Sequence, residues 1–442
     1  MKRYEEYKAT GTEWMPSIPV WWDIQKIGAL FAQRKEKVSD KDFAPISVTK
    51  SGILPQLATA AKTDDGDNRK KVCVGDFVIN SRSDRKGSCG VSSLEGSVSL
   101  INIVLEPREQ LSGKYTHYLL RSHLFSEEFY RNGRGIVADL WTTRYSEMKT
   151  ILLPVPPREE QDQIVRYLDW QVSKINRLIA AKRKQIGLLK EQERSVAVHY
   201  ITHGCNPQAV MKDSGIDWVE MIPQHWDVLF LQQVAEERFV KNAGMLEDDL
   251  LSLSYGHIIR KDINTTDGLL PASFEGYQIV EKNDTVLRLT DLQNDHRSLR
   301  TGLVLERGII TSAYTCIKPR QNILPEYLQL QLHSADLCKV FYGLGGGVRQ
   351  SIGYKDIRKL LMFVPPLEEQ QEILDAIKRK SASSLPCYNK LEEEITVLQE
   401  LRTRLISDVV TGQVDVRGIK APDVEYTYTE TREEELEETE EN

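Results

Sequence analysis

The chain has 442 residues, which is too many for one hydrophobic core and indicates two to four domains. The net charge is -7, but residues 421–442 alone contribute -9, so the rest carries about -7 + 9 = +2 and a nucleic-acid partner is not excluded. No apolar run is long enough to cross a bilayer, and no C-x-x-C pair occurs, which disfavours a membrane protein, a disulfide framework and a cysteine zinc site.

The N-terminal stretch MKRYEEYK lacks the apolar core of a secretory signal peptide. We therefore expect a cytoplasmic protein. At the other end, residues 421–442 combine high negative charge with few apolar residues, which predicts a disordered acidic tail.

The opening of the chain is repeated in its second half. A K-x-x-G-x-x-W pattern beginning at Lys8 recurs 204 residues later, and an I-P-x-x-W-D element follows each copy, at 18–23 and 222–227. We interpret the tryptophans of this element, Trp22 and Trp226, as core anchors rather than as wedges that insert into DNA.

Each half continues with strand-like and then helical patterns. The predicted strands are 72–80 and 97–105 in the first half, and 284–290 and 309–317 in the second. Helical patterns follow at 114–130 and 325–341, and glycine-containing sequence comes after each. Both halves therefore have a mixed α/β plan.

The repeat is clearest at a junction near the end of each half. Residues 152–165 read LLPVPPREEQDQIV and residues 361–374 read LMFVPPLEEQQEIL, so eight of fourteen positions are identical at an offset of 209. Pro157 and Pro366 suit the first position of a helix, where no N–H partner is needed. The glutamates that follow suit the positive end of a helix dipole, and we interpret them as structural rather than as acid–base catalysts.

A long, charged segment with heptad-like spacing follows each junction. These segments predict helices over 157–204 and 366–412, ending at Gly204 and Gly412, with Pro386 expected to kink or break the second. The predicted seam residues are Leu168, Val172, Ile175, Ile179, Ile186, Leu189, Val196, Leu374, Ile377, Leu391, Ile395, Leu398, Leu405 and Val409.

Helices with such an apolar stripe need a partner, and the simplest partner for each is the other. We predict an α+β fold: two mixed α/β domains in tandem pseudo-twofold repeat, joined by two long helices that form an antiparallel coiled coil. The predicted segments are 1–156 and 205–365 for the globular domains, 157–204 and 366–412 for the helices, and 413–442 for a C-terminal segment with the acidic tail.

The sequence has few motifs of catalytic or cofactor-binding sites. There is no phosphate-binding loop, and the G-x-G-x-G pattern at 343–347 follows a helical pattern rather than the strand that a dinucleotide fingerprint requires. His199 and His203 share a helix face but lack a third ligand, so a solvated helix end is the better interpretation. No N-P-P-Y-like tetrapeptide of adenine methyltransferases occurs. We therefore predict no catalytic residues, no cofactor site and no metal site in this chain.

What remains is a binding protein whose candidate surfaces are basic loops. Arginines and lysines there can neutralise DNA phosphates or read guanine edges, although each can equally be an ordinary solvated charge. The candidate DNA-binding residues are Arg82, Arg85, Lys86, Arg131, Arg134, Arg144, Arg288, Arg297, Arg300, Arg349, Gln350 and Lys355.

With its duplicated P-P-x-E-E-Q junctions and I-P-x-x-W-D openings, the chain resembles the specificity subunit of a type I DNA restriction-modification enzyme over residues 4–417. The resemblance implies two target-recognition domains, each reading one part of a split double-stranded DNA target. It also implies that the helices set the spacing and dock two modification subunits, which carry S-adenosylmethionine and methylate adenine. A separate motor-nuclease restriction subunit would cleave unmodified DNA.

Two other classes remain open from the sequence. The chain can instead be a duplicated coiled-coil scaffold for protein interactions without DNA specificity, or a standalone nuclease or methyltransferase. Activity of the isolated chain on DNA would favour the enzyme, whereas failure to bind DNA even with modification subunits would favour the scaffold.

Overall fold

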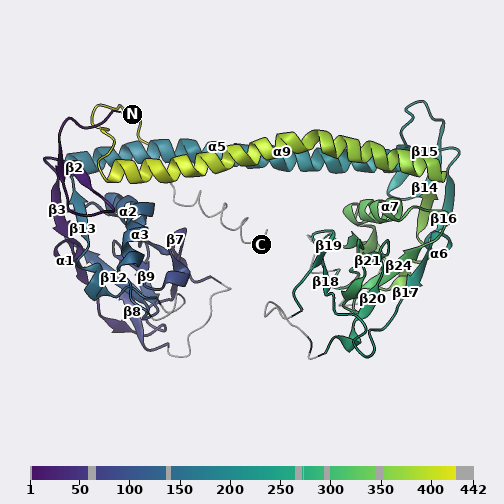
Figure 1. Cartoon of the computed structure of the whole chain (residues 1–442), viewed down its shortest axis with the longest axis horizontal. Helices are drawn as coiled ribbons and strands as arrows, with labels where there is room; N and C mark the ends of the chain where they lie inside the picture. Colours follow the sequence, from purple (N-terminus) through teal and green to yellow (C-terminus); the bar gives the residue numbers. More distant parts are fainter. Residues whose placement is uncertain are drawn as a thin grey trace. The chain divides into compact units, whose positions relative to one another are not determined.

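The computed structural model of the chain describes residues 2–57, 66–135, 141–263, 271, 273–292, 299–344 and 352–424 (Figure 1). It contains two compact units, of which the first is Met1–Lys184 with Lys390–Asn442 and the second is Gln185–Asn389. Each unit therefore holds one globular part, the N-terminal half of one long helix and the C-terminal half of the other. The predicted domain boundaries treated the helices as separate segments, whereas the compact units divide both of them.

The first unit is built on a four-stranded antiparallel sheet with the order β10-β9-β12-β4. Its strands are β4 (Phe31–Gln33), β9 (Phe77–Asn80), β10 (Cys89–Val91) and β12 (Asn102–Pro107). A second sheet contains β5 (Lys37–Val38), β8 (Arg69–Val72) and β11 (Gly96–Val98). Paired strands are β1 (Tyr7–Ala9) with β2 (Ser17–Pro19), β3 (Asp23–Lys26) with β13 (Leu152–Val155), and β6 (Ile46–Thr49) with β7 (Gly52–Pro55). The helices are α1 (Ile27–Leu30), η1 (Ser83–Arg85), α2 (Gly113–Arg121), α3 (His123–Arg131) and α4 (Tyr145–Met148).

The second unit repeats this plan, with the sheet order β17-β24-β21-β22. Its strands are β17 (Ala235–Arg238), β21 (Thr285–Leu287), β22 (Thr301–Leu303) and β24 (Thr315–Pro319). Paired strands are β14 (Met211–Ile216) with β15 (Val219–Pro223), β16 (Asp227–Phe230) with β25 (Leu361–Val364), β18 (Leu251–Ser254) with β19 (His257–Arg260), and β20 (Gln278–Val280) with β23 (Gly308–Ile310). The helices are α6 (Leu231–Val234), η3 (Phe274–Gly276), α7 (Pro325–Leu337), η4 (Val340–Gly343) and α8 (Tyr354–Ile357). Apart from β5, η1 and α3 in the first unit and η3 and η4 in the second, the elements follow the same order, which confirms the predicted tandem α/β repeat.

Several predicted strands are shorter than expected, because turns interrupt them. The predicted strand 72–80 is the end of β8, a turn and then β9. In this turn the buried carboxylate of Asp76 accepts a hydrogen bond from the backbone N–H of Cys73 (2.8 Å) and forms an ion pair with Nε of Arg34 (2.7 Å). Asp284 in the second unit pairs with Arg238 (3.3 Å) in the same way. A charged residue beside apolar ones thus marks a buried turn rather than a strand.

Trp22 and Trp226 are fully buried, which confirms that they are core anchors and not DNA wedges. Both lie under the C-terminal glycine of a long helix. Gly412 has a φ of +73°, and a Cβ there would lie 2.5 Å from Cδ of Pro19 and 3.0 Å from Cζ3 of Trp22. Gly204 has the same φ of +73° against Trp226, so both helix ends require glycine for conformation and for space.

The two long helices are α5 (Arg158–His203) and α9 (Leu367–Val410), each beginning and ending within two residues of its predicted limits. Pro386 was expected to kink or break the second helix; it does not break it, since α9 is continuous through it, and a kink stays a prediction. The carbonyl that loses its partner belongs to Ala382, which is exposed, so water can bond to it.

The helices pair in antiparallel fashion in the first unit. Lys182 of α5 forms an ion pair with Glu394 of α9, and Arg402 Nη1 donates to Asn176 Oδ1 at 2.6 Å, so residue numbers rise along one helix as they fall along the other. Of the fourteen predicted seam residues, ten are buried and four are half-buried, and none is exposed.

A glutamine clamp joins each globular part to the start of a long helix. In the first unit the buried Gln161 accepts the N–H of Ser112 (2.8 Å) and donates to the carbonyls of Pro156 and Gln110 (2.9 Å each). Ser112 caps α2, so the clamp fixes the start of α2 against the start of α5.

The second unit contains the same clamp. Gln370 accepts the N–H of Leu324 (2.8 Å), the residue before α7, and donates to the carbonyls of Pro365 (2.8 Å) and Asn322 (3.1 Å). The glutamine of the P-P-x-E-E-Q motif is thus a structural group in both halves.

A tyrosine then connects each globular part to the end of the other long helix. Tyr115 on α2 donates to the carbonyl of Val410 in the last turn of α9 (3.0 Å), and Tyr327 on α7 donates to Ile201 in the last turn of α5 (3.1 Å). Burial raises the pKa of both tyrosines well above the usual value, so both hydroxyls stay protonated donors. Each unit therefore holds the beginning of one long helix and the end of the other.

Replacing Tyr115 or Tyr327 by phenylalanine is expected to lower the free energy of unfolding of its unit by about 1–2 kcal/mol, because a buried carbonyl loses its donor. Urea unfolding followed by tryptophan fluorescence measures this. Tyr7→Phe is the matched control, since the Tyr7 hydroxyl donates to Gly412 at the same helix end but is only partly buried, and a smaller loss is expected. Equal losses for Tyr115→Phe and Tyr7→Phe would contradict the importance of burial at this contact.

Candidate nucleic-acid interface

Three basic loops of the first unit converge on one another. The backbone of Arg134 exchanges two hydrogen bonds with that of Thr142 (3.0 and 3.1 Å), and the N–H of Ser83 donates to the carbonyl of Trp141 (3.1 Å). The loops at 82–86, 131–135 and 141–144 are thereby joined. We call the six predicted residues they carry the first basic surface: Arg82, Arg85, Lys86, Arg131, Arg134 and Arg144.

These six side chains differ in how available their charges are. Arg131 forms ion pairs with both Glu13 and Glu128. Nε of Arg82 lies 3.2 Å from Oδ1 of Asp84, and Nζ of Lys86 lies 2.5 Å from Oε1 of Glu127. Arg134 lies 3.9 Å from Glu147.

Arg85 and Arg144 are exposed and have no acidic partner within ion-pair distance in the described part of the chain. They are therefore the members of the first basic surface that are most available to an anionic ligand.

Fewer of the predicted DNA-binding residues of the second unit lie within the described part of the chain. Arg297, Arg349 and Gln350 lie outside the described residues. Arg288 is half-buried directly after β21, and Lys355 is exposed on α8.

The prediction that Arg300 contacts DNA is wrong, because its side chain is fully buried. Its guanidinium donates to the carbonyls of Arg288 (3.1 Å) and Thr290 (2.8 Å), and its Nε donates to the hydroxyl of Tyr342 (3.0 Å). A buried arginine with its donors used in this way supports the loop after β21 from inside.

The structure bears on the chemical motifs only in part. Among the described residues, no three His, Cys, Asp or Glu side chains are grouped as metal ligands. His199 and His203 stack on each other with ring centroids 4.7 Å apart. The glycine pattern at 343–347 extends beyond the described residues. None of the helices in the described part of the chain combines the length and the hydropathy of a membrane span.

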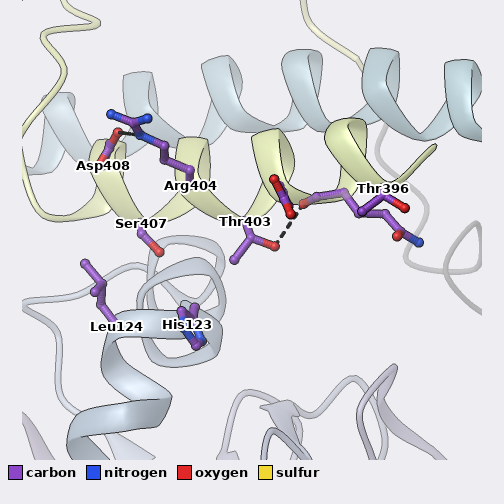
Figure 2. Close-up of a pocket in the computed structure, with 9 residues that line it drawn as sticks. His123, Leu124, Thr396, Thr403, Arg404, Ser407 and Asp408 are labelled. Carbon is purple, nitrogen blue, oxygen red and sulfur yellow. Dashed lines mark hydrogen bonds and ion pairs between the residues drawn. The ribbon is translucent and has the colours of Figure 1, made fainter. Parts of the chain in front are cut away.

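Sequence reasoning missed a basic cleft in the first unit. Lys50, Lys86, Arg121 and His123 line a cavity of about 460 Å³, which we call the Lys50 cleft. A neighbouring groove of about 460 Å³ lies between α3 and α9, and Figure 2 shows His123 and Leu124 below the helix that carries Thr403 and Ser407. The lining residues come from segments far apart in the chain, so no local pattern signals the cleft.

The amino-acid sequence is similar to those of known DNA specificity subunits. Residues 307–396 match the family described as the type I restriction modification DNA specificity domain. A protein of Methanocaldococcus jannaschii described as the type I restriction enzyme MjaX specificity subunit is 22% identical, with 94% of this chain and 98% of the relative covered. The MjaVIII specificity subunit of the same organism is 21% identical, over 91% of this chain and 95% of its own length.

Among solved structures, a chain from a study of complex assembly and conformational transition of the type I R-M system is similar in fold. Its TM-score is 0.53 at 15% identity, and the match covers 90% of this chain and 99% of that chain. Two α/β units of the same topology, attached to a pair of long helices, are thus a known architecture. The chain is thus similar over most of its length to type I restriction enzyme specificity subunits, and residues 307–396 match the DNA specificity domain of that family. Nothing in these comparisons supports the alternative of a protein-interaction scaffold without DNA specificity.

Proposed function

We propose that this chain is the sequence-reading subunit of a type I restriction-modification complex, and that each globular unit reads one half of a bipartite double-stranded DNA target. The observation that carries this proposal is the duplication itself: the same α/β unit is built twice, and each copy is clamped to the start of one long helix and the end of the other. Two independent readers on shared helices are what a split target requires.

In this proposal the long helices set the spacer between the two half-sites and dock two modification subunits. S-adenosylmethionine binds to those partners and not to this chain, and adenine methylation takes place there. Restriction subunits with motor and nuclease activity join the same complex. The chain itself supplies recognition and no catalytic group.

The first basic surface is the proposed DNA-binding face of the first unit. Arg85 and Arg144 are best placed to neutralise phosphates or to donate to guanine, since both are exposed and not held by an acidic neighbour in the described part of the chain. Arg131, in contrast, already donates to two carboxylates, and a contact with DNA would have to replace these bonds.

The proposal is tested by producing the chain together with its modification subunit and mapping methylated adenines in the host DNA. We expect a single split motif with two short specified parts and a spacer of fixed length. Methylation by the chain without partners would contradict the subunit assignment. A continuous motif, or no sequence preference, would contradict the division of reading between two units.

A further inference from the structure

The Lys50 cleft concentrates positive charge at one place in the first unit. Lys50 lies in the turn between β6 and β7, Lys86 just after η1, and Arg121 and His123 at the boundary of α2 and α3. Among the described residues that line it, Glu127 is the one with an acidic side chain. The cleft has the charge of an anion site.

Arg121 is held in position before any ligand arrives. Its Nη1 lies 2.7 Å from Nε2 of His117, and its Nη2 donates to the backbone carbonyl of Lys50. Burial, and then the charge of Arg121, hold the pKa of His117 well below its usual value, so a neutral His117 accepts this bond. The same contact brings Lys50 beside Arg121.

The beginning of α3 adds a second source of positive potential. Ser122 caps this nine-residue helix by accepting the N–H of Phe125 (3.3 Å), and Ser122, His123 and Ser126 all line the cleft. The free N–H groups and the dipole of a helix N-terminus favour an anion. Cationic side chains, hydroxyls and a helix start together suit a phosphate group.

The repeat shows that these cations are not required by the fold. The β18–β19 turn of the second unit carries Tyr255 where the first unit has Lys50. At the offset of 212 that aligns Tyr115 with Tyr327, Arg121 and His123 correspond to His333 and Ala335. The same topology therefore forms with other side chains at the positions of Lys50, Arg121 and His123, so the fold does not require these three residues.

We propose that the Lys50 cleft binds one phosphate of the DNA backbone and thereby positions the first unit on its half-site without reading bases. This inference rests on the proposed function. Of the residues that line the cleft, only Lys86 was among the predicted DNA-binding residues. The cleft adjoins the first basic surface, because the loop that carries Arg82 and Arg85 also carries Lys86. A strand whose bases meet those loops can place a neighbouring phosphate in the cleft.

Glu127 provides a test of opposite sign. Its carboxylate lies 2.5 Å from Nζ of Lys86 and 3.6 Å from Nδ1 of His123, so it competes with a phosphate for the same two side chains. Removing the charge in Glu127→Gln should tighten DNA binding, whereas Lys50→Ala should weaken it. A purely structural role of these residues would not produce a gain in affinity.

The experiment uses the complex of the chain with its modification subunits and a DNA duplex that contains the motif found by methylated-adenine mapping. Binding is measured by fluorescence anisotropy over a salt series. Lys50→Ala is expected to weaken binding roughly tenfold at 0.1 M salt and to reduce the slope of log K against log salt by about one, for specific and nonspecific duplexes alike. The methylated sequence should not change. Lys26→Ala, on the exposed face of β3, is the matched control and should leave both quantities unaltered.

The outcomes separate the two proposals. If the unaltered complex does not bind its motif specifically, the proposed function fails. If it binds specifically but Lys50→Ala behaves like Lys26→Ala and Glu127→Gln gives no gain, with both variants folded by thermal unfolding, then only the phosphate cleft is overturned. A change in the methylated sequence caused by Lys50→Ala would also overturn it, because the cleft would then read bases.

Discussion

Replacement of Gln161 by alanine is expected to lower the free energy of unfolding of the first unit by about 3–5 kcal/mol, because three backbone groups lose their partner at once. The N–H of Ser112 and the carbonyl of Pro156 are buried at this point, and the carbonyl of Gln110 is partly buried.

The repeat supplies both a replicate and a control. Gln370→Ala should destabilise the second unit by a similar amount, since Gln370 makes the same three bonds. The next residue, Gln371, is exposed and bonds only to Asp375 within the described residues, so Gln371→Ala should change stability by less than about 0.5 kcal/mol. Urea unfolding of the three variants measures these differences. Losses below 1 kcal/mol for both clamp variants would show that the glutamines do not hold the junction.

The junction was recognisable in the sequence, but the roles of its residues were only half recognisable. Pro157 and the first-turn carboxylates follow from helix chemistry alone. Glu160, however, is buried and accepts hydrogen bonds from the hydroxyl of Tyr4 (2.6 Å) and Nε1 of Trp21 (3.0 Å). These partners are more than 130 residues away in the chain, and no local spacing connects them with Glu160.

The tandem fold was predictable because identical residues recur at nearly constant offsets, and because the seam spacing of the long helices is regular. Turns were less predictable, since Asp76 stands among apolar residues that favour a strand, and only the partner Arg34 shows that its carboxylate is buried in a turn. That the helix continues through Pro386 was not predictable, for a related reason. The cost of proline in a helix depends on whether the freed carbonyl can reach water, and the sequence does not give that exposure.

The amino-acid sequence shows which segments carry basic residues, but it does not show which of those side chains are exposed to DNA. Arg300 and Arg85 both lie in segments predicted from the sequence as basic loops, yet Arg300 is fully buried and bonded to backbone carbonyls whereas Arg85 is exposed. The Lys50 cleft was missed because its basic residues come from the β6–β7 turn, the segment after η1 and the boundary of α2 and α3, which only the folded chain brings together. A basic residue in a predicted loop is therefore a candidate for DNA contact, and its exposure in the folded chain decides whether it can make that contact.

The largest functional change is expected from altering the length of the helices. Both α5 and α9 pass from one compact unit into the other, and each is fixed at both ends by the clamps and the tyrosine contacts. If these helices set the spacer, adding residues to both must separate the half-sites. At about 1.5 Å per residue, four residues add roughly 6 Å, which is one or two base pairs at about 3.4 Å each.

We propose to insert four residues after Gly187 in α5 and four after Asn389 in α9, where both helices are exposed. The four end contacts are then retained, and the complex should stop methylating its original motif and methylate one with the same half-sites and a spacer longer by one or two pairs. Gly187→Ala changes no length and should leave the spacer unaltered. Methylated-adenine mapping that found the original spacer in the lengthened protein would show that these helices do not measure the distance.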